Sequence, residues 1–160
     1  MKRLHKAMID QFNSDALSSI RNPENKLRTY GLFKVEMGRE LYLSEIKNKK
    51  IRTQLTKLRI SDHNLMIERG RHKGVHKDLR FCPFCQGTVE DEVHFLINCP
   101  TYKHLRKPVM ESFSIENIDT IPITEVFITL MTKASTEVAK FTQKAFELRE
   151  FLINQPRQLD

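Results

Sequence analysis

The sequence predicts a mostly α-helical protein with a small irregular module, which contains all of its cysteines, inserted in the middle. Apolar residues recur at helical spacing along most of the chain, and only five glycines and six prolines interrupt its 160 residues. The three cysteines fall in one stretch, "RFCPFCQGTVEDEVHFLINCP", which has no regular period over its first half. Apolar residues make up 39% of the chain and charged residues 29%, which is typical of a globular protein.

An amino-terminal helix is predicted over residues 1–22. Its apolar residues recur at roughly helical spacing, at Leu4, Met8, Phe12 and Leu17. The stretch "RNPEN" then breaks the pattern. The basic start does not resemble a secretory signal, because Asp10 and Gln11 interrupt the apolar run, and no run approaches the roughly 20 residues of a membrane span. We therefore expect an intracellular protein in a reducing compartment, the nucleus or the cytoplasm, with no membrane partner.

Residues 23–79 are predicted to form a helical, basic segment. Two apolar series in steps of three and four indicate helices, the first at Leu27, Tyr30, Phe33 and Met37 and the second at Ile51, Leu55 and Leu58. The stretch "RELYLSEIKNKKIRTQLTKLRI" continues the helical pattern. Residues 61–80 lack a clean period and contain Gly70 and Gly74, which predicts a short element followed by a basic loop.

The net charge of +7 is concentrated in one part of the chain. Residues 47–80 carry eleven Lys and Arg against three acidic residues, which leaves a net charge of +8. This pattern favours a polyanionic partner, because each cation that neutralises a phosphate also releases condensed counterions. A solvated charged surface is the alternative interpretation. The phosphate contacts that we predict are Lys57, Arg59, Arg69, Arg71, Lys73, Lys77 and Arg80.

The module with the cysteines is predicted over residues 80–106, where the spacing is Cys82-x2-Cys85-x8-His94-x4-Cys99. A Cys-x2-Cys turn can direct two thiolates at one ion. His94 is expected inside a helix whose first turn holds Glu90, Asp91 and Glu92, and Cys99 at the end of that helix. Residues five apart lie about 140° apart on a regular helix, so a frayed or tightened last turn is expected to bring the pair together.

Four such donors suit one tetrahedral zinc ion, Zn²⁺, with the ligands Cys82, Cys85, His94 and Cys99. All four positions are then filled by protein, which indicates a structural ion, because catalytic zinc keeps an open position. Buried thiols beside a hydrogen-bonded histidine remain the alternative. His76 and His104 are other possible fourth ligands, although their flanks do not complete so short a pattern. The predicted class is thus a helical domain with a small irregular zinc-binding module of the CCHC, knuckle-like kind.

Residues 107–160 are predicted to form carboxy-terminal helices that pack on the rest. A helix that begins in "YKHLRKPVMESF" is expected to be interrupted or reset at Pro108. A second helix is predicted in "PITEVFITLMTK". The strongest periodic signal in the chain predicts a third helix, with the apolar positions Val138, Phe141, Ala145, Leu148 and Leu152.

The order of these elements resembles the carboxy-terminal region of reverse transcriptases from non-LTR (LINE-type) retrotransposons of invertebrates. The resemblance covers about residues 26–152 and is carried by "KLRTYGLFK", "YLSEIKNKKIRTQLTKLRISDHNLMIERGRHKG", "RFCPFCQGTVEDEVHFLINCPTYKHLR" and "VAKFTQKAFELRE". It implies a zinc-stabilised module that helps a larger enzyme to hold template RNA or target DNA. It also implies the same four zinc ligands.

The sequence departs from that family in ways that argue against catalysis. No Asp-Asp pair is present to hold the polymerase metals, and no Pro-Asp followed by Asp/Glu-x-Lys follows the cysteines. Retroviral-type knuckles have four residues between the second cysteine and the histidine, whereas this sequence has eight. We therefore expect a fragment or a stand-alone remnant that is not an enzyme; a zinc-dependent nuclease would need an open ligand position or a second metal.

Two functions remain open at this point. The leading one is a nucleic-acid-binding module for RNA or DNA, in which Phe84 or Tyr102 stacks on bases. The alternative for these two rings is that they pack around the Cys-x2-Cys turn. The alternative is a zinc-stabilised helical module for protein–protein interaction, whose stripe over residues 138–152 binds another chain. The rest of a reverse transcriptase is one partner of that second kind.

Overall fold

The computed structural model describes residues 2–22, 25–112, 120–133 and 135–155, and the described part is mostly helical. Its longer helices are α1 (Lys2–Arg21), α4 (Lys49–Arg59), α6 (Lys103–Glu111), α7 (Ile123–Lys133) and α8 (Ser135–Asn154). The shorter ones are α2 (Arg28–Gly31), α3 (Tyr42–Glu45), α5 (Met66–His72), η1 (Lys77–Leu79), η2 (His94–Asn98) and η3 (Pro100–Tyr102). Within the described ranges no strand forms, and one isolated bridge joins Phe81 to Val89.

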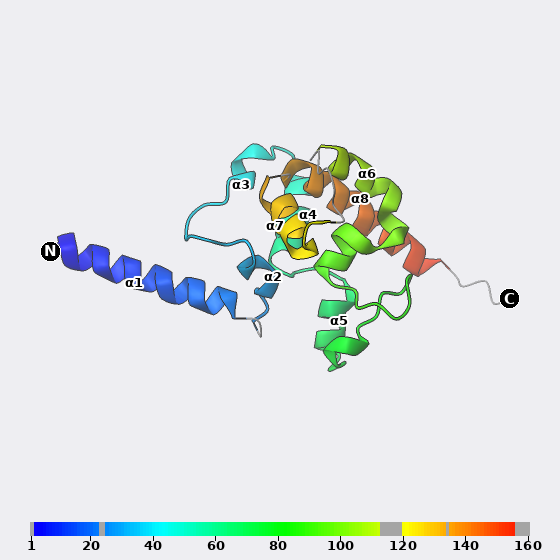
Figure 1. Cartoon of the computed structure of the whole chain (residues 1–160), viewed down its shortest axis with the longest axis horizontal. Helices are drawn as coiled ribbons and strands as arrows, with labels where there is room; N and C mark the ends of the chain where they lie inside the picture. Colours follow the sequence, from blue (N-terminus) through cyan, green and yellow to red (C-terminus); the bar gives the residue numbers. More distant parts are fainter. Residues whose placement is uncertain (1, 23–24, 113–119, 134, 156–160) are drawn as a thin grey trace.

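Helix α8 is the central element of the core. It packs against α3, α4, α6 and α7, most extensively against α4 (Figure 1). The apolar positions Val138, Phe141 and Ala145 of α8 are buried, as are Leu55 and Leu58 of α4. Steps of three and four place these side chains on one helix face, and each large side chain buried there stabilises the fold by about 1.5–3 kcal/mol. The predicted helical class is confirmed, and the module with the cysteines lies in the middle of the chain as expected.

The predicted helix after residue 26 is much shorter in the structure. It ends at Gly31, and a loop follows in which Val35 and Met37 are exposed. The Lys34 ammonium and the Tyr30 hydroxyl both donate hydrogen bonds to the Glu40 carboxylate, which folds this loop back on itself. Specific polar contacts therefore outweigh the apolar spacing that favoured a continuous helix.

Two further helix ends differ in how the chain forms them. The segment predicted to be helical through residue 60 contains two helices, α3 and α4. Asn48 begins α4 because its side chain accepts hydrogen bonds from the backbone of Lys50 and Ile51 at 2.9 and 3.4 Å. Pro108 does not interrupt α6: it lies inside the helix on an exposed side, where its missing N–H leaves only the solvent-facing turn around His104 without a bond.

Helix α1 confirms the predicted amino-terminal helix and extends away from the rest of the molecule (Figure 1). Only its carboxy-terminal end contacts the body, at α2, where Gly31 is required because a Cβ would lie 2.7 Å from the carbonyl oxygen of Ile20. Leu4, Met8 and Phe12 are 64–70% exposed on this helix. Among the described helices, none has both the length and the apolar character that crossing a bilayer requires.

Candidate metal centre

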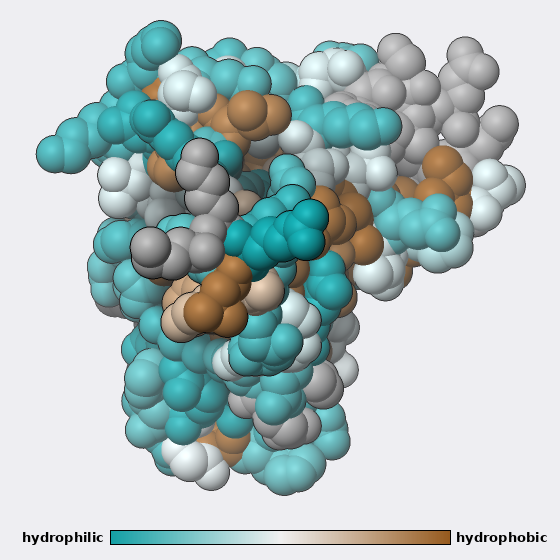
Figure 2. All heavy atoms as spheres, turned by 90° about the vertical axis from the view of Figure 1, so that its left-hand side faces the viewer, coloured by the Kyte–Doolittle hydropathy of each residue, from teal (hydrophilic) through white to brown (hydrophobic). Residues whose placement is uncertain are grey.

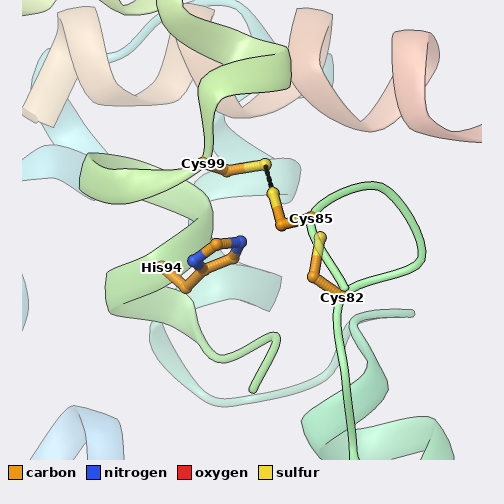
Figure 3. A group of neighbouring side chains, drawn as sticks. All are labelled: Cys82, Cys85, His94 and Cys99. Atoms are coloured by element: carbon orange, nitrogen blue, oxygen red, sulfur yellow. Dashed lines mark hydrogen bonds between the residues drawn. The ribbon is translucent and has the colours of Figure 1, made fainter. Parts of the chain in front are cut away.

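The structure brings Cys82, Cys85, His94 and Cys99 together, as the spacing predicts (Figure 3). Their potential donor atoms all lie within 4.8 Å of one another. The Sγ atoms of Cys85 and Cys99 are 3.4 Å apart. The edge of a tetrahedron with metal–sulfur bonds of zinc length is about 3.8 Å, so small side-chain movements would fit the four donors around one ion.

The hook that carries Cys82 and Cys85 is a closed loop. The bridge between Phe81 and Val89 closes it, and the backbone N–H of Cys82 donates to the carbonyl of Thr88 at 2.7 Å. The chain reverses at Gln86 and Gly87, whose φ angles of 41° and 78° lie in the left-handed region that glycine adopts without strain. This loop contains the Cys-x2-Cys turn that the sequence predicts.

His94 and Cys99 meet through a widened helical turn. The backbone N–H of Cys99 donates to the carbonyl of His94 at 2.7 Å, five residues earlier, and residues His94–Asn98 form the π-helical turn η2. The expectation of a frayed or tightened last turn is therefore wrong. A π turn contains one residue more than an α turn, and this extra residue brings position i+5 over position i. Turns of this kind occur often at functional sites.

The three acidic residues before His94 have different roles. The carboxylate of Asp91 caps the turn by accepting a hydrogen bond from the backbone N–H of His94 at 2.7 Å. Glu90 and Glu92 are buried and point into the protein. Glu92 is in the first helical turn as expected, whereas Glu90 precedes the helix, and both make long-range ion pairs.

Glu90 joins the module to α8. Its carboxylate accepts two hydrogen bonds from the guanidinium of Arg149, at 2.9 and 2.7 Å, and both side chains are almost fully buried. The same carboxylate accepts the backbone N–H of Met66 at 2.7 Å, at the start of α5. The sequence gives no sign of this pairing, since the two residues are 59 positions apart.

Glu92 joins the module to the amino-terminal half of the chain. Its Oε1 atom accepts from Ser61 Oγ at 2.8 Å, contacts His63 Nε2 at 3.0 Å and pairs with Arg28 at 3.2 Å. Burial alone would raise the pKa of Glu92, but the hydrogen bond to His63 and the charges of His63 and Arg28 lower this pKa to about 2. His63, which has no role that the sequence reveals, thus helps to hold the module in place.

The electrostatics of the four donors favour a bound cation. The hydrogen bond from the Cys82 thiol is the main cause that lowers the pKa of Cys99 to about 3, and the same contact raises the pKa of Cys82. Deprotonation of all three thiols would be favoured by a positive charge between them, which a bound cation would supply. Both ring nitrogens of His94 are buried and have no hydrogen-bond partner within the described part of the chain. A metal ion at the centre would supply a partner for one of them.

Arg106 supports the ligand-bearing turn from α6. Its guanidinium donates to the carbonyl of Leu96 at 2.6 Å and to that of Cys99 at 2.7 Å. Leu96 lies within the π turn and Cys99 follows it, and the Cys99 carbonyl also accepts the backbone N–H of Tyr102 at 3.3 Å. The sequence does not identify this residue, because an Arg in a predicted helix is usually exposed.

The aromatic rings near the hook pack against one another. Phe84 meets Tyr102 edge to face with ring centroids 6.2 Å apart, and Tyr102 contacts Phe95 at 5.0 Å. Tyr102 is only 1% exposed, so it is not available to stack on a base. Tyr102 therefore packs in the protein instead of stacking on a base, and Phe84 is half-buried in the same cluster.

The predicted phosphate contacts divide into three groups. Arg59 is only 3% exposed, and it donates to the carbonyl of Met131 and to the Glu40 carboxylate while its guanidinium lies 4.3 Å from the Phe33 ring centroid. This prediction is wrong, because Arg59 is a core residue.

Arg80 donates inward to two backbone carbonyls, and exposed Arg71 pairs with Glu68 at 2.8 Å. The remaining residues, Lys57, Arg69, Lys73 and Lys77, are exposed and form no side-chain hydrogen bond or ion pair with described residues.

These four free cations do not share one surface. Arg69, Lys73 and Lys77 lie on or next to α5, within residues 66–80, which we call the basic arm. The arm forms the lower end of the molecule in Figure 1. In Figure 2 the lower end of the molecule shows mostly hydrophilic side chains. Lys57 lies on α4 and lines a separate cavity with Asp62, Glu147 and Glu150. Lys57 thus shares its cavity with carboxylates, whereas the arm carries its three cations close together in the chain.

The remaining sequence candidates lie away from the cluster. His76 is exposed on the basic arm, 3.6 Å from Asp78, and His104 is exposed on α6. Neither belongs to the donor group around Cys82. The stripe over residues 138–152 is mostly buried against α4, so it is not a free docking face.

Comparisons with protein families, with curated proteins and with solved structures find no match to this chain.

Proposed function

We propose that this chain is a non-catalytic nucleic-acid-binding module, held together by one structural zinc ion, whose basic arm contacts the phosphates of RNA or DNA. The observation that carries the proposal is the attachment of an uncompensated cationic arm to a closed group of four metal donors. A solvated charged surface would account for the arm alone, and buried thiols would account for the cysteines alone. Their direct connection through Glu90 is what favours a binding module.

Zinc fits the donors better than other common ions. Three thiolates and one imidazole are soft or borderline ligands, which suit tetrahedral zinc, and hard cations such as Mg²⁺ prefer oxygen. The two unpartnered ring nitrogens of His94 support a ligand role for this residue. Four protein donors leave no open position for substrate or water, so the ion stabilises structure.

Glu90 connects the basic arm to the metal-binding turn. The backbone N–H of Ile67 donates to the Glu90 carbonyl at 3.0 Å, and that of Met66 donates to the Glu90 carboxylate. The backbone N–H of Glu90 donates in turn to the carbonyl of Arg80 at 2.9 Å. Both ends of the arm are thereby tied to the residue that leads into the π turn. Loading the metal should therefore fix the position of the cations.

The resemblance to the carboxy-terminal region of non-LTR retrotransposon reverse transcriptases agrees with this proposal. In that setting the chain would help a polymerase elsewhere in a larger protein to hold its template or its target. The chain itself would contribute binding and no catalytic step.

Metal removal tests the zinc part of the proposal. Chelation, or Cys85→Ser, should unfold at least residues 80–100, since structural zinc contributes an apparent ~10–16 kcal/mol in small finger peptides. Circular dichroism, thermal melting and the zinc content of the purified protein measure this effect. Thr88→Ala, which alters the same hook but no donor, is the control. Unchanged spectra and melting after metal removal would refute a structural zinc ion.

A salt titration with matched charge variants tests the nucleic-acid part. The variant Arg69→Gln/Lys73→Gln/Lys77→Gln should bind oligonucleotides more weakly than the wild type. The slope of log K against log salt should shrink by about 2 to 3, because each lost phosphate contact removes about 0.7 to 0.9. The control, Lys103→Gln/Lys133→Gln/Lys144→Gln, removes the same charge from exposed residues elsewhere. An equal effect of both variants, or no binding at low salt, would contradict the proposal.

A module for protein–protein interaction is the second candidate, and α1 is the feature that favours it. The exposed side chains of Leu4, Met8 and Phe12 form an apolar stripe along α1. Figure 2 views the molecule from the left-hand side of Figure 1, and apolar side chains are visible there among hydrophilic ones. Met8→Glu should abolish association with such a partner and leave nucleic-acid affinity unchanged. The reverse result would remove this candidate.

A further inference from the structure

Two apolar side chains are exposed where the basic arm joins the metal hook, Leu79 at the end of the arm and Phe81 at the start of the hook. Leu79 is 58% exposed and Phe81 is 41% exposed. Arg80, which separates them, points inward, and its guanidinium donates to the carbonyls of Ile67 and Val75 at 2.8 and 3.0 Å. Its methylene groups lie against Gly70, where an added Cβ would be 2.6 Å from Arg80 Cγ. With Arg80 fixed on the inside, its two neighbours are held at the surface.

The backbone that carries Phe81 is well fixed. Phe81 forms the bridge with Val89 that closes the hook, and the next residue, Cys82, donates its N–H to Thr88 and is one of the metal donors. The exposed ring therefore sits on a rigid support instead of a mobile loop. A rigid support lowers the entropy that a ring loses when it binds a flat partner.

The charges beside this ring indicate the kind of partner. Lys77 is four residues before Phe81, and it is exposed like Arg69 and Lys73 without an ion pair to any described residue. Cations that follow a phosphate backbone, combined with an aromatic ring for the bases, are the two components of single-strand binding sites. Bases inside a duplex are already stacked on one another, so a side chain at its surface cannot stack on them.

We propose that Phe81 stacks on an unpaired base of a single-stranded nucleic acid, whose phosphates contact Arg69, Lys73 and Lys77, while Leu79 covers the edge of the base. The inference rests on the proposed nucleic-acid binding and adds the class of ligand, single-stranded over double-stranded. Phe84 and Tyr102, the two rings that the sequence suggested for stacking, are replaced in this role by Phe81.

Fluorescence anisotropy with labelled oligonucleotides tests the proposal on the full, zinc-loaded chain. The probes are an unstructured 16-mer and a duplex of the same length, each as DNA and as RNA. The wild type should prefer the single strands. Phe81→Ala should weaken single-strand binding by about 5- to 100-fold, the range for loss of one base–aromatic stack. Duplex affinity should change less than about twofold, since only phosphate contacts remain there.

Three further variants make the result specific. Phe81→Tyr keeps an aromatic ring and should bind single strands like the wild type. Phe151→Ala removes an exposed ring from the end of α8, far from the arm in sequence, and should have no effect. If Phe81→Ala does not retain zinc, Phe81→Leu takes its place, because leucine keeps apolar volume without the flat face.

The outcomes separate the two proposals. Absence of binding to every probe would overturn the proposed function, and the stacking inference with it. Equal affinity for single strand and duplex, unchanged in Phe81→Ala, would overturn the inference and leave the phosphate-binding function standing. Leu79 and Phe81 would then be assigned to a protein contact. Comparison of the DNA and RNA probes shows which of the two the module prefers.

Discussion

At the scale of single residues, Arg106 shows how a side chain outside the donor set can control a metal site. It neither touches the ion's position nor carries a donor atom. Its guanidinium donates to the carbonyls of Leu96 and Cys99 and so fixes the backbone of the ligand-bearing turn. Its positive charge also lies near thiolates whose total charge exceeds that of a divalent ion.

We expect Arg106→Met to lower the affinity for zinc by about 10- to 100-fold, the usual effect of losing a residue that orients a ligand. Methionine keeps a similar length and apolar contact but supplies neither the hydrogen bonds nor the charge. Competition with a chromophoric chelator measures the affinity. Lys107→Met, which removes an exposed cation from the same helix, should have no such effect. Equal affinities in the two variants would show that Arg106 does not orient the site.

At the scale of elements, the π turn η2 determines whether His94 and Cys99 can share one ion. A turn closed by five residues is less stable than an α turn, because its backbone geometry is less favourable. The chain adopts it where Asp91 caps one end and Arg106 holds the other. His94 and Cys99 can reach one ion through this turn, so the less stable turn and the metal site depend on each other.

Insertion of an alanine after Asn98 should abolish metal binding. The insertion converts an i+5 spacing into i+6, and the cysteine would then leave the face of the turn that carries the histidine. Asn98 is exposed, so the loss of its side chain alone is harmless, and Asn98→Ala should bind zinc like the wild type. Zinc content after purification provides the measurement. An insertion variant that still binds one equivalent of zinc would show that the register is not required.

The sequence predicts this element only in part. The spacing of the four donors identifies them correctly as a group, because short Cys-x2-Cys hooks depend on local geometry alone. It does not predict the π turn, since its hydrogen bond depends on Arg106 and Asp91 acting together. It also does not reveal that Arg59 is buried: only the tertiary contacts with Glu40, Phe33 and Met131 show that this cation belongs to the core. The helices α1, α7 and α8 follow from apolar spacing, whereas the loop after Gly31 follows from polar contacts that spacing does not encode.

At the scale of the whole molecule, buried carboxylates connect parts of the chain that are far apart in sequence. Glu90 pairs with Arg149 near the carboxy-terminal end of α8, and Glu92 pairs with Arg28 beside α2. These two glutamates flank Asp91, the cap of the metal-binding turn. The packing of the helices and the metal module therefore stabilise each other, and neither should fold fully without the other.

Stability should fall in acid partly because of Glu92. Its folded-state pKa is about 2, below the ordinary value of 4.5, so its contribution is complete above about pH 5 and is lost as the pH falls toward 2. The difference of about 2.5 units corresponds to about 3 kcal/mol in the free energy of unfolding. Glu92→Gln lacks this contribution. The difference in stability between wild type and variant should thus be largest above about pH 5 and should fall to roughly half at pH 3.

Chemical denaturation at several pH values measures this difference. Loss of zinc in acid affects both proteins and cancels in the comparison. Glu147→Gln, which changes a fully exposed carboxylate, should show little difference from wild type at any pH. A wild-type advantage over Glu92→Gln that stays constant from pH 7 to pH 3 would mean that the ionised carboxylate is not what stabilises the fold.

The isolation of α1 has a mechanical consequence. Its twenty residues give a rod of about 30 Å, anchored only at the end near Gly31. A partner held at its far tip would be kept at that distance from the body. The helix would then act as a spacer that leaves the arm and the hook unobstructed.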